Sequence, residues 1–402
     1  MAHSRRDVVL LFGARSVRLF AYGALSVVLA LYLHELALTG AQIGLLFTLT
    51  LAGDAGISLW ITTTADRLGR KRMLLLGAGL MVMAGVVFSL TGNPLLLMLA
   101  GIIGVISPSG NEIGPFLSLE QAALSQLLPA ENRTRDFAWY NLAGSLAAAC
   151  GALFGGFLSQ GLIGAGFSEL SSYRAVILLY AVCGLLLVLF FLFLSSRVEA
   201  PPAAAAGKRV LGLHASKGIV MKLSALFALD AFAGGFVIQS MVAYWFHVRF
   251  DLDAGILGSI FFGANILAGV SALLAARIAN RIGLINTMVF THIPSNMLLC
   301  LVPFMPTAGW AVFILLLRFS ISQMDVPTRQ SYTMAVVAPD ERSAASGVTT
   351  IARSLGASVS PALAGVFLAA PALLGAPFLI AGSLKIAYDL LLYRSFSRTG
   401  TK

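Results

Sequence analysis

Residues 172–196 read SYRAVILLYAVCGLLLVLFFLFLSS, a run of mostly apolar side chains in which Arg174 is the one charged residue. An α-helix rises about 1.5 Å per residue, so crossing the hydrocarbon core of a bilayer takes roughly 20 apolar residues. This stretch is therefore predicted to be a transmembrane helix.

Stretches of the same kind fill the rest of the chain. Of the 402 residues, 58% are hydrophobic and 11% are charged, and the mean hydropathy is +0.89; in soluble domains about 25% of residues are charged. The predicted spans are 8–33, 42–64, 72–91, 94–126, 136–160, 172–196, 219–248, 254–279, 284–305, 309–337, 343–369 and 373–394. We therefore expect an all-α polytopic membrane protein with twelve transmembrane helices.

Basic residues collect on alternate loops between these spans. Nineteen are expected on one side: Arg5, Arg6, Arg67, Arg70, Lys71, Arg72, Arg133, Arg135, Arg197, Lys208, Arg209, Lys217, Lys222, Arg277, Arg281, Arg342, Arg394, Arg398 and Lys402. The opposite loops carry Arg174 and Arg249. The positive-inside rule predicts a multi-pass protein of the cell membrane with both termini in the cytoplasm. The net charge of +10 then reflects topology and contact with anionic lipid rather than nucleic-acid binding.

The chain repeats itself at an offset of about 210 residues. The sequence ADRLG at 65–69 matches ANRIG at 279–283, and PAENR at 129–133 matches PDER at 339–342. Two six-helix halves follow, each with its own bundle. We expect an N-terminal bundle at 1–196, a cytoplasmic linker at 197–218 and a C-terminal bundle at 219–402. Such repeats are typical of transporters whose solute binds between the halves near mid-membrane.

The loop DRLGRKR at 66–72 resembles the loop after the second span in the major facilitator superfamily, and the likeness extends over nearly the whole chain. The resemblance implies two pseudo-symmetric six-helix bundles, with spans 1, 4, 7 and 10 lining the cavity. It also implies that the loop stabilises one access state, which gives gating candidates Asp66, Gly69, Arg70 and Lys71. Thr62 and Asn280 depart from the family pattern, because they stand where a glycine and an aspartate are usual.

Twelve ionisable residues fall well inside the predicted spans. They are Arg15, Arg18, Arg318, Arg329, Arg353 and Lys385, and Asp54, Glu112, Glu120, Asp230, Asp325 and Asp389. At about 2.5–3.5 kcal/mol for each lipid-facing charge, inserting them would cost on the order of 30 kcal/mol, more than the stability of a typical domain, about 5–15 kcal/mol. These side chains are therefore expected to face one another or a water-filled cavity.

Helical spacing gathers several of these residues on one face of a span. The stripe on the tenth span consists of Arg318, Ser322, Asp325, Arg329 and Tyr332, at steps of three and four. Pro327 predicts a kink within that stripe. The candidate residues for lining the cavity and contacting the solute are Arg15, Arg18, Tyr22, Glu112, Arg318, Asp325, Arg329 and Arg353.

Several roles stay open at this point. The candidates for carrying a coupled proton are Asp54, Glu112, Asp230 and Asp325. Each has a structural alternative: pairing with an arginine for the aspartates, and a hydrogen bond to the broken backbone for Glu112. Glu120 and Arg329 are related by the repeat and are gating candidates. One interpretation is a salt bridge between them that closes the cytoplasmic side, and the other is contact with the solute.

Charged and polar residues nearer the membrane surface and on the outer helices also have structural interpretations. Arg15 could instead reach lipid headgroups. Lys385 and Asp389 lie one turn apart on the twelfth span and are expected to pair with each other. His292 is expected to be a packed polar residue with a backbone partner.

The remaining motifs exclude several functions. No phosphate-binding Gly-rich loop ending in Lys-Ser/Thr, no metal-ligand cluster and no nucleophile–His–Asp set stands out, so we expect no enzyme, no cofactor and no metal. We expect a monomeric secondary transporter of a small polar organic solute, working by alternating access and coupled to protons as an exporter by antiport. Proton-coupled uptake of an organic anion is the alternative, and a non-transporting membrane sensor or scaffold is a remote one.

Overall fold

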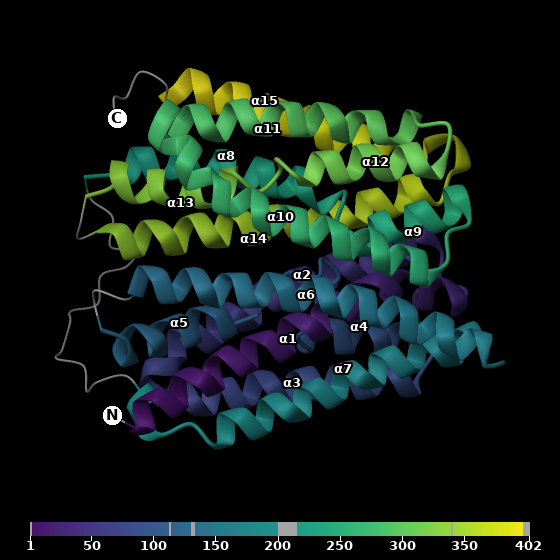
Figure 1. The fold of residues 1–402 in the computed structure, drawn as a ribbon, viewed down its shortest axis with the longest axis horizontal. Coiled ribbons are helices and arrows are strands. Elements are labelled where there is room, and N and C mark those ends of the chain that lie inside the picture. Colours follow the sequence, from purple (N-terminus) through teal and green to yellow (C-terminus); the bar gives the residue numbers. More distant parts are fainter. Residues whose placement is uncertain (1, 112–113, 130–132, 200–214, 339–340, 397–402) are drawn as a thin grey trace. The chain divides into compact units, whose positions relative to one another are not determined.

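The computed structural model describes residues 2–111, 114–129, 133–199, 215–338 and 341–396. Within these ranges the regular structure is helical, without strands (Figure 1). The helices are α1 (Ala2–Glu35), α2 (Gly40–Leu68), α3 (Arg70–Leu90), α4 (Pro94–Ile103), α5 (Phe116–Leu127), α6 (Arg133–Gly164), α7 (Glu169–Leu192), η1 (Ser196–Val198), α8 (Lys217–Gly235), α9 (Gln239–Phe250), α10 (Ala254–Ile282), α11 (Leu284–Leu301), η2 (Val302–Phe304), α12 (Ala308–Phe319), α13 (Asp325–Val336), α14 (Arg342–Leu368), η4 (Pro371–Leu373) and α15 (Ala376–Phe396). The expected all-α membrane fold is confirmed.

Among the described residues, ten helical segments are long and apolar enough to cross a bilayer. The fourth and tenth predicted spans are instead interrupted, because each consists of two shorter helices, α4 with α5 and α12 with α13. In the fourth span the interruption carries Pro108 and Pro115, and Gly110 and Gly114 adopt positive φ angles of 68° and 84°. Proline lacks the backbone N–H that a helix uses as a hydrogen-bond donor, and glycine tolerates a positive φ angle. These residues favour a non-helical segment, and α4 ends at Ile103.

The tenth span is interrupted at Ser320–Met324, before Pro327 rather than at it. Pro327 is the third residue of α13. A residue in the first helical turn has no intrahelical acceptor for its N–H, so proline is tolerated there. The predicted kink at Pro327 is therefore a chain break one turn earlier.

One face of α7 shows why these helices suit lipid. Leu178, Val182, Leu185 and Leu189 recur at helical spacing and are each about half exposed. An exposed apolar stripe of this kind would be costly in water, whereas in acyl chains it costs nothing. This agrees with a multi-pass membrane protein.

The chain divides into two compact units. Unit 1 comprises Met1–Thr39, Leu49–Ala206 and Asp251–Phe262, and unit 2 comprises Gly40–Thr48, Gly207–Phe250 and Gly263–Lys402. The predicted linker at 197–218 lies largely outside the described residues, and the predicted domain boundaries stay a prediction.

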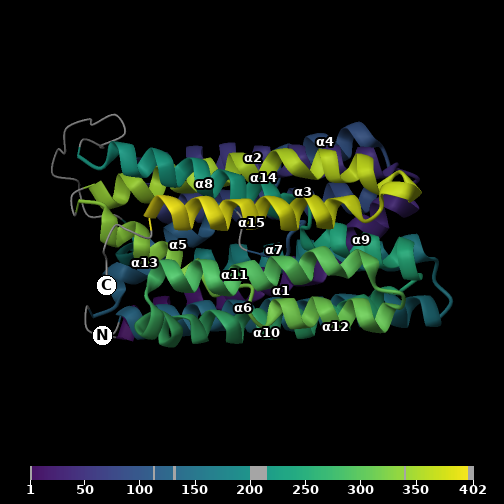
Figure 2. The same ribbon diagram turned by 90° about the horizontal axis from the view of Figure 1, so that it is seen from above.

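Each unit has its own helix packing. In unit 1, α1 packs along α6 and α7, and α3 packs along α7. In unit 2, α8 packs against α14 and α15, and α11 packs along α15 (Figure 2). A cluster of buried aromatic and aliphatic side chains that includes Phe227, Tyr332 and Tyr388 joins α8, α11, α13 and α15. This core supports the polar residues described next.

Candidate functional site

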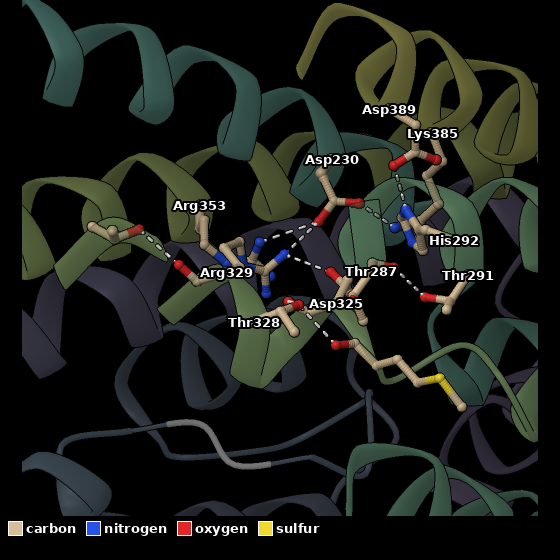
Figure 3. Close-up of polar contacts among 12 residues, drawn as sticks. Asp230, Thr287, Thr291, His292, Asp325, Thr328, Arg329, Arg353, Lys385 and Asp389 are labelled. Carbon is tan, nitrogen blue, oxygen red and sulfur yellow. Dashed lines mark hydrogen bonds and ion pairs between the residues drawn. The ribbon is translucent and has the colours of Figure 1, made fainter. Parts of the chain in front are cut away.

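A single carboxylate, Asp230 on α8, organises the polar interior of unit 2 (Figure 3). Its Oδ1 is 2.5 Å from Nζ of Lys385 on α15. Its Oδ2 is 3.1 Å from a guanidinium nitrogen of Arg329 on α13 and 3.1 Å from one of Arg353 on α14. Asp230 is 3% exposed. Three cations from three helices therefore meet one buried carboxylate, which must be ionised to hold them.

Arg329 bridges Asp230 to a second carboxylate. Asp325 lies one turn earlier on α13, and its Oδ2 is 3.0 Å from the same guanidinium nitrogen. Asp325 is also in the first turn of α13, where a negative charge favours the exposed N–H groups of the helix. The local pair that the sequence offered for Asp325 is present, and its possible role in carrying a proton stays a prediction.

A third carboxylate, Asp389, lies beside this cluster on α15 (Figure 3). Its Oδ1 is 2.9 Å from Nδ1 of His292 on α11, and its Oδ2 accepts a hydrogen bond from Asn296 Nδ2 at 3.2 Å. The expectation for His292 was a backbone partner, and the ring is bound to Asp389 instead. Lys385, which was expected to pair with Asp389, donates to Asp230.

The corresponding interior of unit 1 contains a two-point ion pair. Arg18 on α1 donates from both terminal nitrogens to the two carboxylate oxygens of Glu120 on α5, each at 2.7 Å. Both side chains are fully buried. Tyr140 on α6 donates its hydroxyl to Glu120, and the Arg18 guanidinium lies 4.6 Å from the centroid of the Phe116 ring. A bidentate pair of this kind fixes the orientation of the two side chains in addition to pairing their charges.

The other predicted residues of the first span have packing partners. Arg15 donates to Asn141 Oδ1 at 3.2 Å, and its guanidinium lies 4.4 Å from the centroid of the Tyr140 ring. Tyr22 is fully buried, and its ring stacks on that of Tyr180 at 6.3 Å between centroids. Whether either residue contacts solute stays a prediction.

Asp54 on α2 is bonded to the interrupted fourth span. Its Oδ2 accepts a hydrogen bond from the backbone N–H of Gly114 at 3.2 Å. This bond satisfies a donor that the helix break would otherwise leave without a partner. Glu112 lies outside the described residues, so its predicted role stays a prediction.

The loop that carries the gating candidates has a partly buried acceptor, Glu199. Gly69 separates α2 from α3 with a φ of 99°, a conformation that favours glycine. The backbone N–H groups of Arg70 and Lys71 donate to the carboxylate of Glu199 at 2.5 and 3.3 Å. Glu199 thus caps the N-terminus of α3 and ties it to the end of η1. The side chain of Asp66 lies outside the described residues.

The repeat relates the two ion pairs with their charges exchanged. Arg18 precedes Glu120 by 102 residues, and Asp230 precedes Arg329 by 99 residues. In each pair the earlier residue lies on the first helix of its half and the later one on the second piece of an interrupted span. Glu120 pairs with Arg18, and Arg329 pairs with Asp230, each within its own unit. The predicted Glu120–Arg329 bridge stays a prediction.

The remaining candidate, Arg318 in the last turn of α12, lies 5.0 Å from the centroid of the Phe319 ring. Arg353 is the most exposed member of the Asp230 cluster, with 34% of its side chain accessible. Sequence reasoning assigned His292 only a packing role and did not single out Tyr140 or Glu199. The signal that was available was their position, because each polar side chain falls in or at the end of a predicted span.

Comparisons with known proteins agree with this architecture. The model of the Major Facilitator Superfamily matches residues 11–361. An uncharacterized membrane protein of Saccharomyces cerevisiae, YJR124C, is 31% identical over 421 residues, covering 96% of this chain and 93% of the yeast protein. The quinolone resistance protein NorA of Staphylococcus aureus is 27% identical over 133 residues, 33% of each chain.

Solved structures share the fold at low sequence identity. The nucleoside transporter NupG superimposes with a TM-score of 0.73 at 16% identity, covering 98% of this chain and 99% of that one. A bacterial homologue of the lysosomal transporter Spinster, inward-facing and occupied, superimposes with a TM-score of 0.76 at 16% identity, covering 100% and 99%.

Proposed function

The chain belongs to the major facilitator superfamily, and from this membership we propose a secondary transporter that exports a small polar organic solute in exchange for protons. It is a multi-pass membrane protein with the fold of transporters. The direction of transport, the coupled ion and the class of solute are parts of this proposal. It further includes a monomer in the cell membrane with both termini in the cytoplasm.

The observation that carries the proposal is the contact of Asp230 with three cations. While Arg329, Arg353 and Lys385 touch it, the carboxylate is held as an anion. A conformational change that withdrew those cations would leave a buried charge without partners, and taking up a proton is then the cheaper state. Asp230 and its three cations lie on four different helices, α8, α13, α14 and α15. A small movement of one helix against another therefore changes which cations contact the carboxylate. Asp230 is therefore our first candidate for the coupled proton, with Asp325 beside it.

The solute class rests on Arg353, because 34% of its side chain is accessible. An arginine binds two oxygens of a carboxylate or phosphate at once, which suits a polar or zwitterionic solute. Partial similarity to a quinolone resistance protein supports export of an organic compound. The same guanidinium also favours the second candidate, proton-coupled uptake of an organic anion. A sensor or scaffold without transport remains the remote alternative.

Flux into proteoliposomes under an imposed pH gradient tests the proposal. With the lumen more acidic than the outside, antiport predicts that the fluorescent quinolone norfloxacin accumulates in the lumen. With the lumen more alkaline than the outside, so that the proton gradient is directed inward, symport predicts that a radiolabelled organic acid such as succinate accumulates. A flux that depends on neither sign of the gradient, for either probe, would contradict proton coupling.

The variant Asp230→Asn should abolish gradient-driven accumulation. The matched control is Glu169→Gln, which removes one carboxylate from an exposed position at the start of α7. Equal flux in Asp230→Asn and in the control would remove Asp230 from the proposal.

A further inference from the structure

A histidine and a carboxylate are paired deep in unit 2 on two helices, α11 and α15, that supply none of the predicted cavity residues. His292 Nδ1 is 2.9 Å from Asp389 Oδ1, and the two side chains are 5% and 0% exposed. Asn296 holds the other Asp389 oxygen at 3.2 Å. A carboxylate with both oxygens engaged beside an imidazole orients that ring and stabilises its charged form.

The cations of the surrounding network bind the other two carboxylates. Arg329, Arg353 and Lys385 contact Asp230, and Arg329 also contacts Asp325, whereas the ion pair of Asp389 among the described residues is with His292. Histidine is the side chain whose ordinary titration lies nearest to neutral pH. While Asp230 is held by its three cations, the imidazole beside Asp389 is therefore a natural acceptor for a proton that enters this network.

We propose that His292 is a second proton-binding site of this protein, with Asp389 as the residue that positions it and Lys385 as the link to Asp230. The proposal rests on the proton coupling of the proposed function and adds to it a site on the outer helices. In the neutral ring Nδ1–H donates to the ionised Asp389, because a carboxylate can only accept. The incoming proton then binds the lone pair of Nε2, and the imidazole becomes an imidazolium with no other bond changed.

The titratable groups near His292 come from α15 and α8, and further charged groups lie on α13 and α12, which pack against α11. Asp389, Lys385 and Tyr388 are on α15, and the Tyr388 ring lies edge-on to the imidazole at 6.1 Å between centroids. Asp230 is on α8, Asp325 and Arg329 are on α13, and α12 carries Arg318. Asn296, on α11 itself, completes the surroundings.

Protonation of His292 is coupled to Asp230 through α15. Lys385 and Asp389 are one helical turn apart, and Lys385 donates to Asp230 at 2.5 Å (Figure 3). An imidazolium added beside Asp389 raises the positive charge of the network by one and repels the ammonium of Lys385. This weakens the hold of Lys385 on Asp230, which is the change that the proposed coupling requires.

Titration of the histidines by NMR tests the site directly, with the proton itself as the probe. In full-length protein carrying ¹⁵N-histidine in nanodiscs, the His292→Gln variant identifies the signal. We expect the ring nitrogens of His292 to change from the neutral to the charged pattern as the pH is lowered. Asp389→Asn should lower the charged fraction of His292 at pH 6.5 several-fold, while the exposed His34 is unaffected as an internal control.

Proton uptake after an acid jump, measured in unbuffered detergent solution, provides a second readout that does not need the Asp389 variant. His292→Gln should take up about one proton fewer than the wild type over the same interval. A His292 signal that stays neutral from pH 5 to pH 9, or equal uptake by wild type and His292→Gln, would overturn the site. If His292 titrates as expected but Asp230→Asn retains gradient-driven flux, the proposed function fails and the site stands. If Asp230→Asn abolishes flux and His292 does not titrate, only the site fails.

Discussion

Arg18 and Glu120 meet through two hydrogen bonds of 2.7 Å with both side chains fully buried. The equivalent positions of the second half, Asp230 and Arg329, form the same pair with the charges exchanged. Among the ion pairs of the described residues, the carboxylate of the first half has one cationic partner and that of the second half has three. The two halves thus share a helix contact that differs in its number of cations, and the roles predicted for Arg18 and Glu120 stay predictions.

Removing one member of the Arg18–Glu120 pair should be severely destabilising. Glu120→Gln leaves a guanidinium buried without its counter-charge, a change that costs about 3–5 kcal/mol for buried pairs. Replacing both members, as in Arg18→Met with Glu120→Leu, should restore most of the loss because no charge then remains buried. Thermal unfolding in detergent measures the order of the three proteins. A single variant as stable as the wild type would show that the pair is not desolvated.

Two arginines that share Asp230 should respond differently. Arg329 is 8% exposed and contacts both Asp230 and Asp325, whereas 34% of the Arg353 side chain is accessible and it contacts Asp230. Arg329→Gln should therefore lower the thermal unfolding midpoint clearly more than Arg353→Gln, whose effect should stay near 1 kcal/mol. Transport by Arg353→Gln should show a raised KM, because Arg353 is the proposed solute contact. Equal loss of stability in the two variants would contradict the difference in burial.

Two glycines of α14 should show effects of opposite sign. A Cβ at Gly365 would overlap the backbone oxygen of Gly40 within unit 2, whereas nothing lies within 4 Å of a Cβ at Gly347. Gly365→Ala should destabilise by about 1–3 kcal/mol through overpacking. Gly347→Ala should be neutral or stabilising by up to about 1 kcal/mol, because alanine restricts the unfolded chain. Unfolding midpoints of the two variants make the comparison, and a stabilised Gly365→Ala would argue against this close helix crossing.

Loss of the Glu199 carboxylate should loosen the start of α3. It accepts hydrogen bonds from the N–H groups of Arg70 and Lys71, and helix caps of this kind are worth about 0.5–2 kcal/mol. Glu199→Ala should therefore speed amide hydrogen exchange in the first turn of α3. Exchange at the start of α7, which Ser168 caps, is the control and should not change. Unaltered exchange at residues 70 and 71 would mean that water replaces the carboxylate without cost.

The sequence by itself determined the class of protein, because hydropathy and the positions of loops are local properties. Apolar runs of about 20 residues predicted the ten spans that are long single segments among the described residues, and the boundaries of the two halves stay a prediction. The Asp325–Arg329 contact was also accessible, since residues four apart on a helix always share a face.

Only the tertiary structure decided which charges meet. Lys385 joins Asp230 across 155 residues, His292 joins Asp389 across 97, and Arg18 joins Glu120 across 102. Spacing along one helix cannot predict such partners, because the choice depends on which helices pack together and at what depth each side chain lies. The interruptions in the fourth and tenth spans belong to the same category. Their prolines and glycines are visible in the sequence, but the place where the helix ends depends on which tertiary contacts, such as Asp54 with Gly114, satisfy the freed backbone groups.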